Sequence, residues 1–176
     1  MDTIATFAAA ATKAGATVET VATAGDALAA VAQLAGRLGD GVVASSRAGA
    51  AFAPPGAMVG GTTDEVADAM LAISIARLGV AETGSVLLGS NAMADRLPGM
   101  LAHTHVVILP ASRLVASLED ATPILHDLAA PGERQVRSMG FVTGPSRSAD
   151  IERVITVGVQ GPRALHVVIV EGDGPW

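Results

Sequence analysis

The sequence predicts an α/β fold of the Rossmann-like type, with a mainly parallel sheet that is covered by helices on both faces. Short apolar and β-branched runs alternate along the chain with longer segments of helical periodicity, and several of these runs end at glycine or proline. The length of 176 residues suits one hydrophobic core, and no repeat of fixed period is visible. We therefore expect a single domain over residues 1–176.

The first predicted helix and the strands around it have clear patterns. Residues 17–22 (TVETVA) are short and β-branched, as in a strand, and residues 41–46 (GVVASS) have the same character. Between them, residues 25–39 place apolar side chains at helical intervals and end at a glycine, which predicts a helix. A loop rich in glycine and proline is expected at residues 47–63.

A second helix is predicted to start at Thr63. Asp64 and Glu65 follow in its first turn, where acidic side chains suit the positive end of the helix dipole. The apolar stripe of this helix would continue through Val66, Met70, Ile73 and Leu78.

The second half of the chain is expected to supply most of the strands. Residues 80–90 indicate two strands separated by a tight break at Gly84, and residues 105–110 indicate a buried strand that stops at a proline. Residues 117–129 are predicted to be helical, with Pro123 limiting the start of the helix or bending it. The remaining predicted strands are 138–144, 156–161 and 164–171, with a short helical piece between the first two.

Composition excludes several classes of function. The chain has no cysteine, so it offers no disulfide, thiolate nucleophile or cysteine-ligated cluster. Four aromatic residues and a net charge of −6 argue against a nucleic-acid surface. No apolar run is long enough for a membrane span, and residues 1–15 lack the basic start of a secretory signal. We expect a cytoplasmic protein.

Positive charge is concentrated near the C-terminal end of the chain. Residues 134–163 carry a net charge of +3, which leaves −9 on the remainder. The arginines of this island are Arg134, Arg137, Arg147, Arg153 and Arg163. Such a local excess of basic side chains favours contact with an anion or an acidic surface.

Three loops are candidates for a ligand site, because ligands of open α/β sheets bind where strands end and helices begin. They are residues 81–85 (AETGS), 144–150 (GPSRSAD) and 158–162 (GVQGP). The second of them, GPSRSAD, is predicted to start a helix whose free amide groups attract a carboxylate or phosphate, with Arg147 adding a bidentate contact. An ordinary capped helix explains the same pattern. The candidate ligand-binding residues are Thr83, Gly84, Ser85, Gly144, Pro145, Ser146, Arg147, Ser148, Asp150, Gly158, Gln160 and Gly161.

Glu82 is the candidate catalytic group. It follows a predicted strand and precedes a glycine turn, where a carboxylate is placed to act as a base or a nucleophile. The alternative is a solvated acid, or one that is paired with an arginine. His103 and His105 share one face of a strand, but no third ligand is clearly placed, so we predict no metal site.

Residues 143–171 (TGPSRSADIERVITVGVQGPRALHVVIVE) closely resemble the signature of the LUD-domain family, of the lactate utilization protein C type. Residues 81–88 (AETGSVLL) and 96–121 resemble the preceding blocks of that family, in the same order. On this chain the family signature falls on Glu82, Thr83, Gly84, Gly144, Pro145, Ser146, Arg147, Asp150, Gly158, Gly161 and Pro162. Two positions depart from it: Ser148 stands where threonine is common, and Gln160 where histidine is usual.

The resemblance implies a fold of the NagB/RpiA/CoA-transferase-like class. It also implies a subunit that helps to oxidise L-lactate to pyruvate together with sister proteins, in which iron–sulfur clusters are expected. This chain would then bind no cofactor itself, and a small anionic ligand would occupy its loops. The alternatives are a stand-alone enzyme of the same fold that acts through Glu82 on an acyl or sugar-phosphate ligand, and a non-catalytic binding or regulatory subunit.

Overall fold

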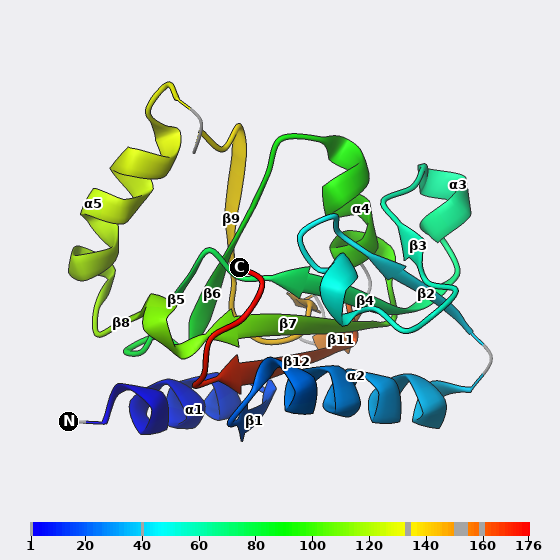
Figure 1. Cartoon of the computed structure of the whole chain (residues 1–176), viewed down its shortest axis with the longest axis horizontal. Helices are drawn as coiled ribbons and strands as arrows, with labels where there is room; N and C mark the ends of the chain where they lie inside the picture. Colours follow the sequence, from blue (N-terminus) through cyan, green and yellow to red (C-terminus); the bar gives the residue numbers. More distant parts are fainter. Residues whose placement is uncertain (1, 40, 133–134, 150–154, 159–160) are drawn as a thin grey trace.

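The centre of the protein is a six-stranded sheet in which every pair of neighbouring strands is parallel. The computed structural model describes residues 2–39, 41–132, 135–149, 155–158 and 161–176 (Figure 1). This sheet confirms the predicted fold class. Its strands, in spatial order, are β1 (Thr17–Val21), β12 (Ala164–Val170), β7 (Thr104–Pro110), β4 (Ala69–Ile75), β2 (Val42–Ser45) and β3 (Met58–Val59).

Helices cover both faces of this sheet, as predicted. On one face, α1 (Thr3–Lys13) packs Phe7 and Ala11 against alternate residues of β7 and β12, including Val107 and Val167. On the other face, α2 (Ala24–Leu38) packs Ala27 and Val31 against the intervening residues of the same strands. Period-two alternation along each strand thus supplies two separate apolar cores.

Shorter elements complete the two layers. On the face that α1 covers, α4 (Met93–Leu101) packs next to α3 (Thr63–Val66), with Ala72 and Ala102 in their shared core. On the α2 face, Phe52 of the 3-10 turn η1 (Ala50–Phe52) is buried and stacks on Trp176, with 6.4 Å between the ring centroids. Neither α1 nor α4 was predicted from the sequence.

A second, four-stranded sheet stands beside the first and was not predicted. Its order is β8-β5-β6-β9, and α5 covers it through an apolar core that includes Leu87 and Leu128. In Figure 1, α5 and β9 lie on the opposite side of β7 from β12 and β1. The elements are β5 (Leu78–Val80), β6 (Ser85–Ser90), β8 (Leu114–Val115) after the turn η2 (Ala111–Arg113), α5 (Leu118–Ala129) and β9 (Ser138–Val142).

The helix predicted from Thr63 to Leu78 is wrong after its first turn. Thr62 and Glu65 form a capping box at the start of this turn, and Thr62 N donates to Glu65 Oε2 over 2.8 Å. The chain then enters β4, a central strand with almost every residue buried. A strand buried on both faces is apolar at every position, so its side chains matched the helical spacing without forming a helix.

The short helix predicted after Pro145 is also wrong where the structure describes it. Residues Arg147–Ala149 form strand β10, which pairs antiparallel with β11 (Ile155–Val157). Residues 150–154, which include Asp150, lie outside the described residues. Pairing with a segment further along the chain overrides the local capping pattern.

Candidate functional site

Two of the three predicted loops meet at the C-terminal end of α1. Gly84 has a φ of 65°, and a Cβ added there would collide with the backbone of Ala11. Gly144 has a φ of 72°, and its Cβ would collide with the carbonyl of Ala14. Glycine therefore permits both the left-handed turn and the close approach of the helix. The two loops are joined by a short hydrogen bond between the hydroxyls of Ser85 and Thr143.

The third loop joins this group through backbone hydrogen bonds. Ser146 N donates to Pro162 O and Gly158 N donates to Ser146 O, both over 2.9 Å. A Cβ at Gly161 would lie 3.1 Å from the Cβ of Ser146. We call these three loops the signature cluster. It consists of residues 82–85, residues 143–147, and Gly158, Gly161 and Pro162. Gln160 lies outside the described residues.

Among the residues that the structure describes, the signature cluster has no helix N-terminus of the kind that was predicted to hold an anion. Because Ser146 N and Gly158 N bond within the protein, these amides do not point outward to a ligand. Arg147 is exposed, and its Nη2 donates to the carbonyl of Ala14 over 3.2 Å. Ser148 contributes its backbone to β10. Whether these residues bind an anion stays a prediction, and residues 147–149 form a strand where that prediction placed the start of a helix.

The cluster also lies at the amino ends of the strands of the six-stranded sheet, and not at their carboxyl ends. The end of α1 leads directly into β1, and Pro162 stands just before β12. Residues 82–85 and 143–147 do follow strands, but these are β5 and β9 of the second sheet. The sequence could not reveal this, because it does not show to which sheet a strand belongs.

Glu82 has a structural partner. Its Oε1 accepts a hydrogen bond from Leu118 N over 2.7 Å, which satisfies one free amide at the start of α5. The neighbouring Thr83 hydroxyl is buried and has no hydrogen-bond partner in the described part of the chain. Catalysis by Glu82 stays a prediction, and its observed contact is that of a helix cap.

A cavity of about 470 Å³ lies at the carboxyl ends of β2 and β4, between α4 and the second sheet. Sites of this size and position commonly bind small molecules in α/β proteins. Arg47, Arg77 and Arg96 line it, together with Asp95 and a group of serines. We call it the arginine cavity. It contains none of the residues that the sequence analysis proposed for a site.

A signal for two of these arginines was present in the sequence. Arg47 comes two residues after β2 and Arg77 two residues after β4, so both stand just past strand ends. The second of these strands was predicted as helix, which hid the pattern. Arg96 belongs to α4, far from both in the sequence, and only the fold brings it to the same cavity.

One wall of the arginine cavity contains a buried histidine–serine pair. His105 Nε2 and Ser74 Oγ are 3.0 Å apart, and Ser74 lines the cavity. Burial lowers the pKa of His105 from 6.5 to about 4, so the imidazole is neutral at neutral pH. The ring also packs against Gly99 of α4, where a Cβ would lie 2.6 Å from its Cε1. The pair therefore joins β4 to β7 at the cavity wall, and the imidazole ring lies against α4.

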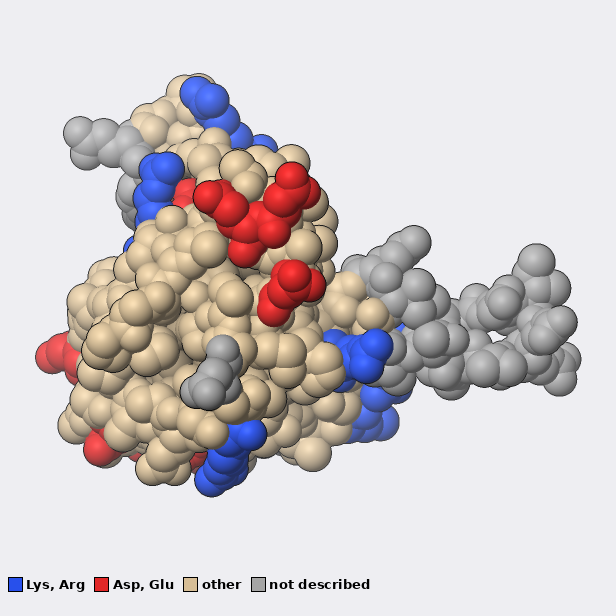
Figure 2. Space-filling view, turned by 90° about the vertical axis from the view of Figure 1, so that its right-hand side faces the viewer, with Lys and Arg blue, Asp and Glu red and all other residues tan. Residues whose placement is uncertain are grey.

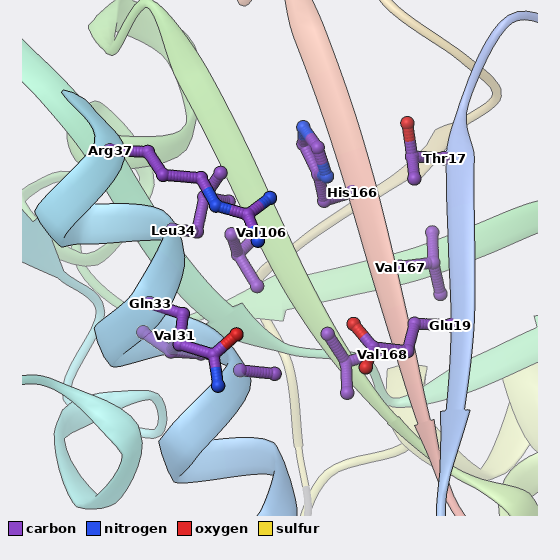
Figure 3. Close-up of a pocket in the computed structure, with 11 residues that line it drawn as sticks. Thr17, Glu19, Val31, Gln33, Leu34, Arg37, Val106, His166, Val167 and Val168 are labelled. Carbon is purple, nitrogen blue, oxygen red and sulfur yellow. The ribbon is translucent and has the colours of Figure 1, made fainter.

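A smaller cleft of about 150 Å³ lies under α2 near the amino ends of β1 and β12 (Figure 3). Arg37 extends from α2, while Glu19 and His166 extend from the two strands. Burial lowers the pKa of His166, and the nearby charge of Glu19 opposes that shift. The volume is below the usual range of organic ligand sites, so we place no site here.

Among the described residues, no three histidine, cysteine or acidic side chains are grouped to hold a metal ion. None of the helices in those residues has the length and apolar character needed to cross a bilayer.

Comparison with known proteins gives one family and several relatives. The family model of the LUD domain matches residues 58–170. Lactate utilization protein C 1 of Bacillus mycoides (strain KBAB4) is 36% identical over 101 residues, which cover 57% of this chain and 43% of the relative. Lactate utilization protein C of Halalkalibacterium halodurans is 38% identical over 107 residues, covering 60% and 46%. The matched region spans less than half of the length of these relatives.

A solved structure resembles the whole fold. The crystal structure of a DUF162 family protein from Deinococcus radiodurans superposes with a TM-score of 0.68 and covers 96% of both chains. The sequences are 18% identical, so this likeness supports the fold and not a shared activity.

Proposed function

This chain belongs to the LUD domain family, and from that premise we propose that it serves in the utilization of L-lactate, as a subunit of a system that oxidises L-lactate to pyruvate. The observation that carries the proposal is the similarity to curated relatives named lactate utilization protein C, at 36% and 38% identity. The family match covers residues 58–170 and therefore includes all three loops of the signature cluster in full.

Electron transfer in this proposal belongs to partner proteins. Oxidation of a hydroxy acid to a keto acid removes two electrons, and this chain has no cysteine with which to hold an iron–sulfur cluster. We therefore propose that sister subunits carry such clusters, and that this chain binds the sister subunits or a small anionic ligand.

The signature cluster is the surface that we propose for this contact. Lys13, Arg147 and Arg163 are exposed and lie on segments that meet there. Figure 2 shows basic side chains at several separate places on this face of the protein, and a group of acidic side chains in its upper part. An exposed group of cations favours a carboxylate, or an acidic surface of a sister subunit.

Growth on L-lactate tests this role. We expect Arg147→Ala to prevent growth on L-lactate. The protein should still accumulate, because the side chain is exposed and its replacement removes one hydrogen bond to the carbonyl of Ala14. Arg37→Ala is the matched control, since it removes an exposed arginine from α2. Normal growth of the Arg147 variant would remove Arg147 from the site, and normal growth after deletion of the whole gene would refute the proposed function.

Co-purification tests the partners. The tagged chain, isolated from lactate-grown cells of its own host, should retain iron-containing proteins, and the mixture should reduce an artificial electron acceptor when L-lactate is added. Loss of the iron-containing proteins in the Arg147→Ala preparation, but not in Arg37→Ala, would assign the contact to the signature cluster. A preparation that contains this chain alone would contradict the proposed assembly.

A further inference from the structure

The arginine cavity holds more positive charge than its acidic side chain neutralises. Arg47 forms an ion pair with Asp95, with 3.8 Å between Nε and Oδ1, and its backbone N also donates to that oxygen. Within the residues that the structure describes, no ion pair involves Arg77 or Arg96. Two guanidinium groups therefore line the cavity without a counter-ion, which favours an anionic ligand.

The unsatisfied polar groups of the cavity lie close to this charge. Arg96 is held in place because Nη1 donates to Ser138 Oγ over 2.7 Å and Nη2 contacts Met93 Sδ at 3.2 Å. Its Nε is buried and lacks a partner among the described residues, and so does the hydroxyl of Ser90. Both residues line the cavity, and buried donors of this kind normally have an acceptor.

Other polar side chains of the cavity are already satisfied. Ser46 Oγ accepts from Gly49 N over 3.1 Å, and Ser74 bonds to His105. The amide of Asn91 bonds to the backbone at both of its ends, accepting from Arg137 N and donating to Gln135 O. The unmet hydrogen-bonding capacity is therefore concentrated at Arg96 and Ser90, beside the unpaired charge.

Arg77 is positioned by a glycine of the second sheet. A Cβ added to Gly89 would lie 3.3 Å from Arg77 Cγ, so the aliphatic part of Arg77 runs across this glycine in β6. The stem covers apolar surface while the residue as a whole remains exposed. Arg77 lines the same cavity as Arg96, which belongs to α4.

The size and the apolar lining indicate what kind of anion fits. With about 30 Å³ of liquid volume for each water, a six-heavy-atom hydroxy acid occupies at most roughly 180 Å³ and would leave most of the cavity unfilled. Leu88, Met100, Met139 and Val142 supply apolar lining, and Met100 is 55% exposed. Methionine adapts its shape to flexible apolar ligands.

We propose that the arginine cavity binds an amphipathic organic anion. The oxyanion head contacts the guanidinium groups of Arg77 and Arg96 and the hydroxyl of Ser90, and a short apolar body lies along the methionine side chains. This site shares no residue with the signature cluster, and the inference does not rest on the proposed role in lactate oxidation.

Calorimetric titration of the purified chain tests the inference with three probes: octanoate, octyl phosphate and 1-octanol. Octanoate or octyl phosphate should bind at one site with a Kd below about 1 mM, and binding should weaken as salt is added. The tighter of the two identifies the head group as carboxylate or phosphate. Binding of 1-octanol with equal affinity, or no saturable binding of either anion, would overturn the proposal.

Variants locate the site. Arg77→Gln and Arg96→Gln should each weaken binding of the anion about tenfold or more, because each removes a charged hydrogen-bond donor. Arg37→Gln removes the same charge from α2 and should leave binding unchanged. Should Arg96→Gln fail to fold in circular dichroism, the exposed Arg77 still provides the test. Unchanged affinity in the Arg77 variant would refute the assignment.

Discussion

Replacing Gly84 with alanine should destabilise the protein far more than replacing another glycine of similar backbone conformation. Gly84 has a φ of 65°, where an alanine side chain costs about 1–2 kcal/mol. The new Cβ would also collide with backbone atoms of Ala11 and Ala10, which cannot rotate away as a side chain does. Helix α1 must therefore shift from the sheet.

The size of the second effect follows from what α1 buries. Phe7 and Ala11 have no exposed surface, and partial exposure of one large apolar side chain costs about 1.5–3 kcal/mol. Together with the backbone strain, we expect Gly84→Ala to lower the free energy of unfolding by about 2.5–5 kcal/mol. This is a large part of the stability of a typical domain, about 5–15 kcal/mol.

Gly56→Ala is the matched control. Gly56 has a φ of 87°, and a Cβ there meets no atom within 4 Å, so this variant reports the backbone strain alone. Urea unfolding followed by far-ultraviolet circular dichroism gives both free energies, provided that the slopes agree. Equal losses in the two variants would refute the argument that Gly84 exists to let α1 approach.

Two further predictions concern single side chains. Glu82→Ala should lower the free energy of unfolding by about 1 kcal/mol, because the Leu118 amide at the start of α5 loses its acceptor. Glu119→Ala, in the first turn of α5, should have a smaller effect. Equal shifts of the melting temperature in the two variants would contradict the capping role of Glu82. Burial lowers the pKa of His105 to about 4, so the unfolded chain binds a proton that the folded chain does not between pH 6.5 and 4. Stability should therefore fall by up to roughly 3 kcal/mol as the pH drops through this window. His105→Gln should reduce this acid dependence in urea titrations, with a smaller part left from His166, and an unchanged dependence would show that His105 is not its source.

The site divides into a part that sequence could predict and a part that it could not. The three signature loops were selected from their glycines and serines, and the structure does bring them together around the end of α1. The arginine cavity was missed, because Arg47, Arg77 and Arg96 are separated along the chain by many residues. No local pattern connects an arginine after β2 with one on α4.

By itself the sequence determined the fold class, the family and those elements whose signals are local. The predicted helices at α2 and α5 are present, and both begin at a capping box, a contact between residues three apart. The strands at β1, β7 and β12 are short apolar or β-branched runs bounded by turn residues.

Only the tertiary structure decided the rest. It turned residues 69–75 into a central strand, because burial between two layers removes the alternation by which a strand is recognised. It also made residues 147–149 a strand, because a partner at residues 155–157 satisfies their backbone better than a helix cap does. Both choices depend on contacts between segments that are distant in the sequence. The same contacts place the cavity at the carboxyl ends of the strands of the six-stranded sheet and the signature cluster at their amino ends.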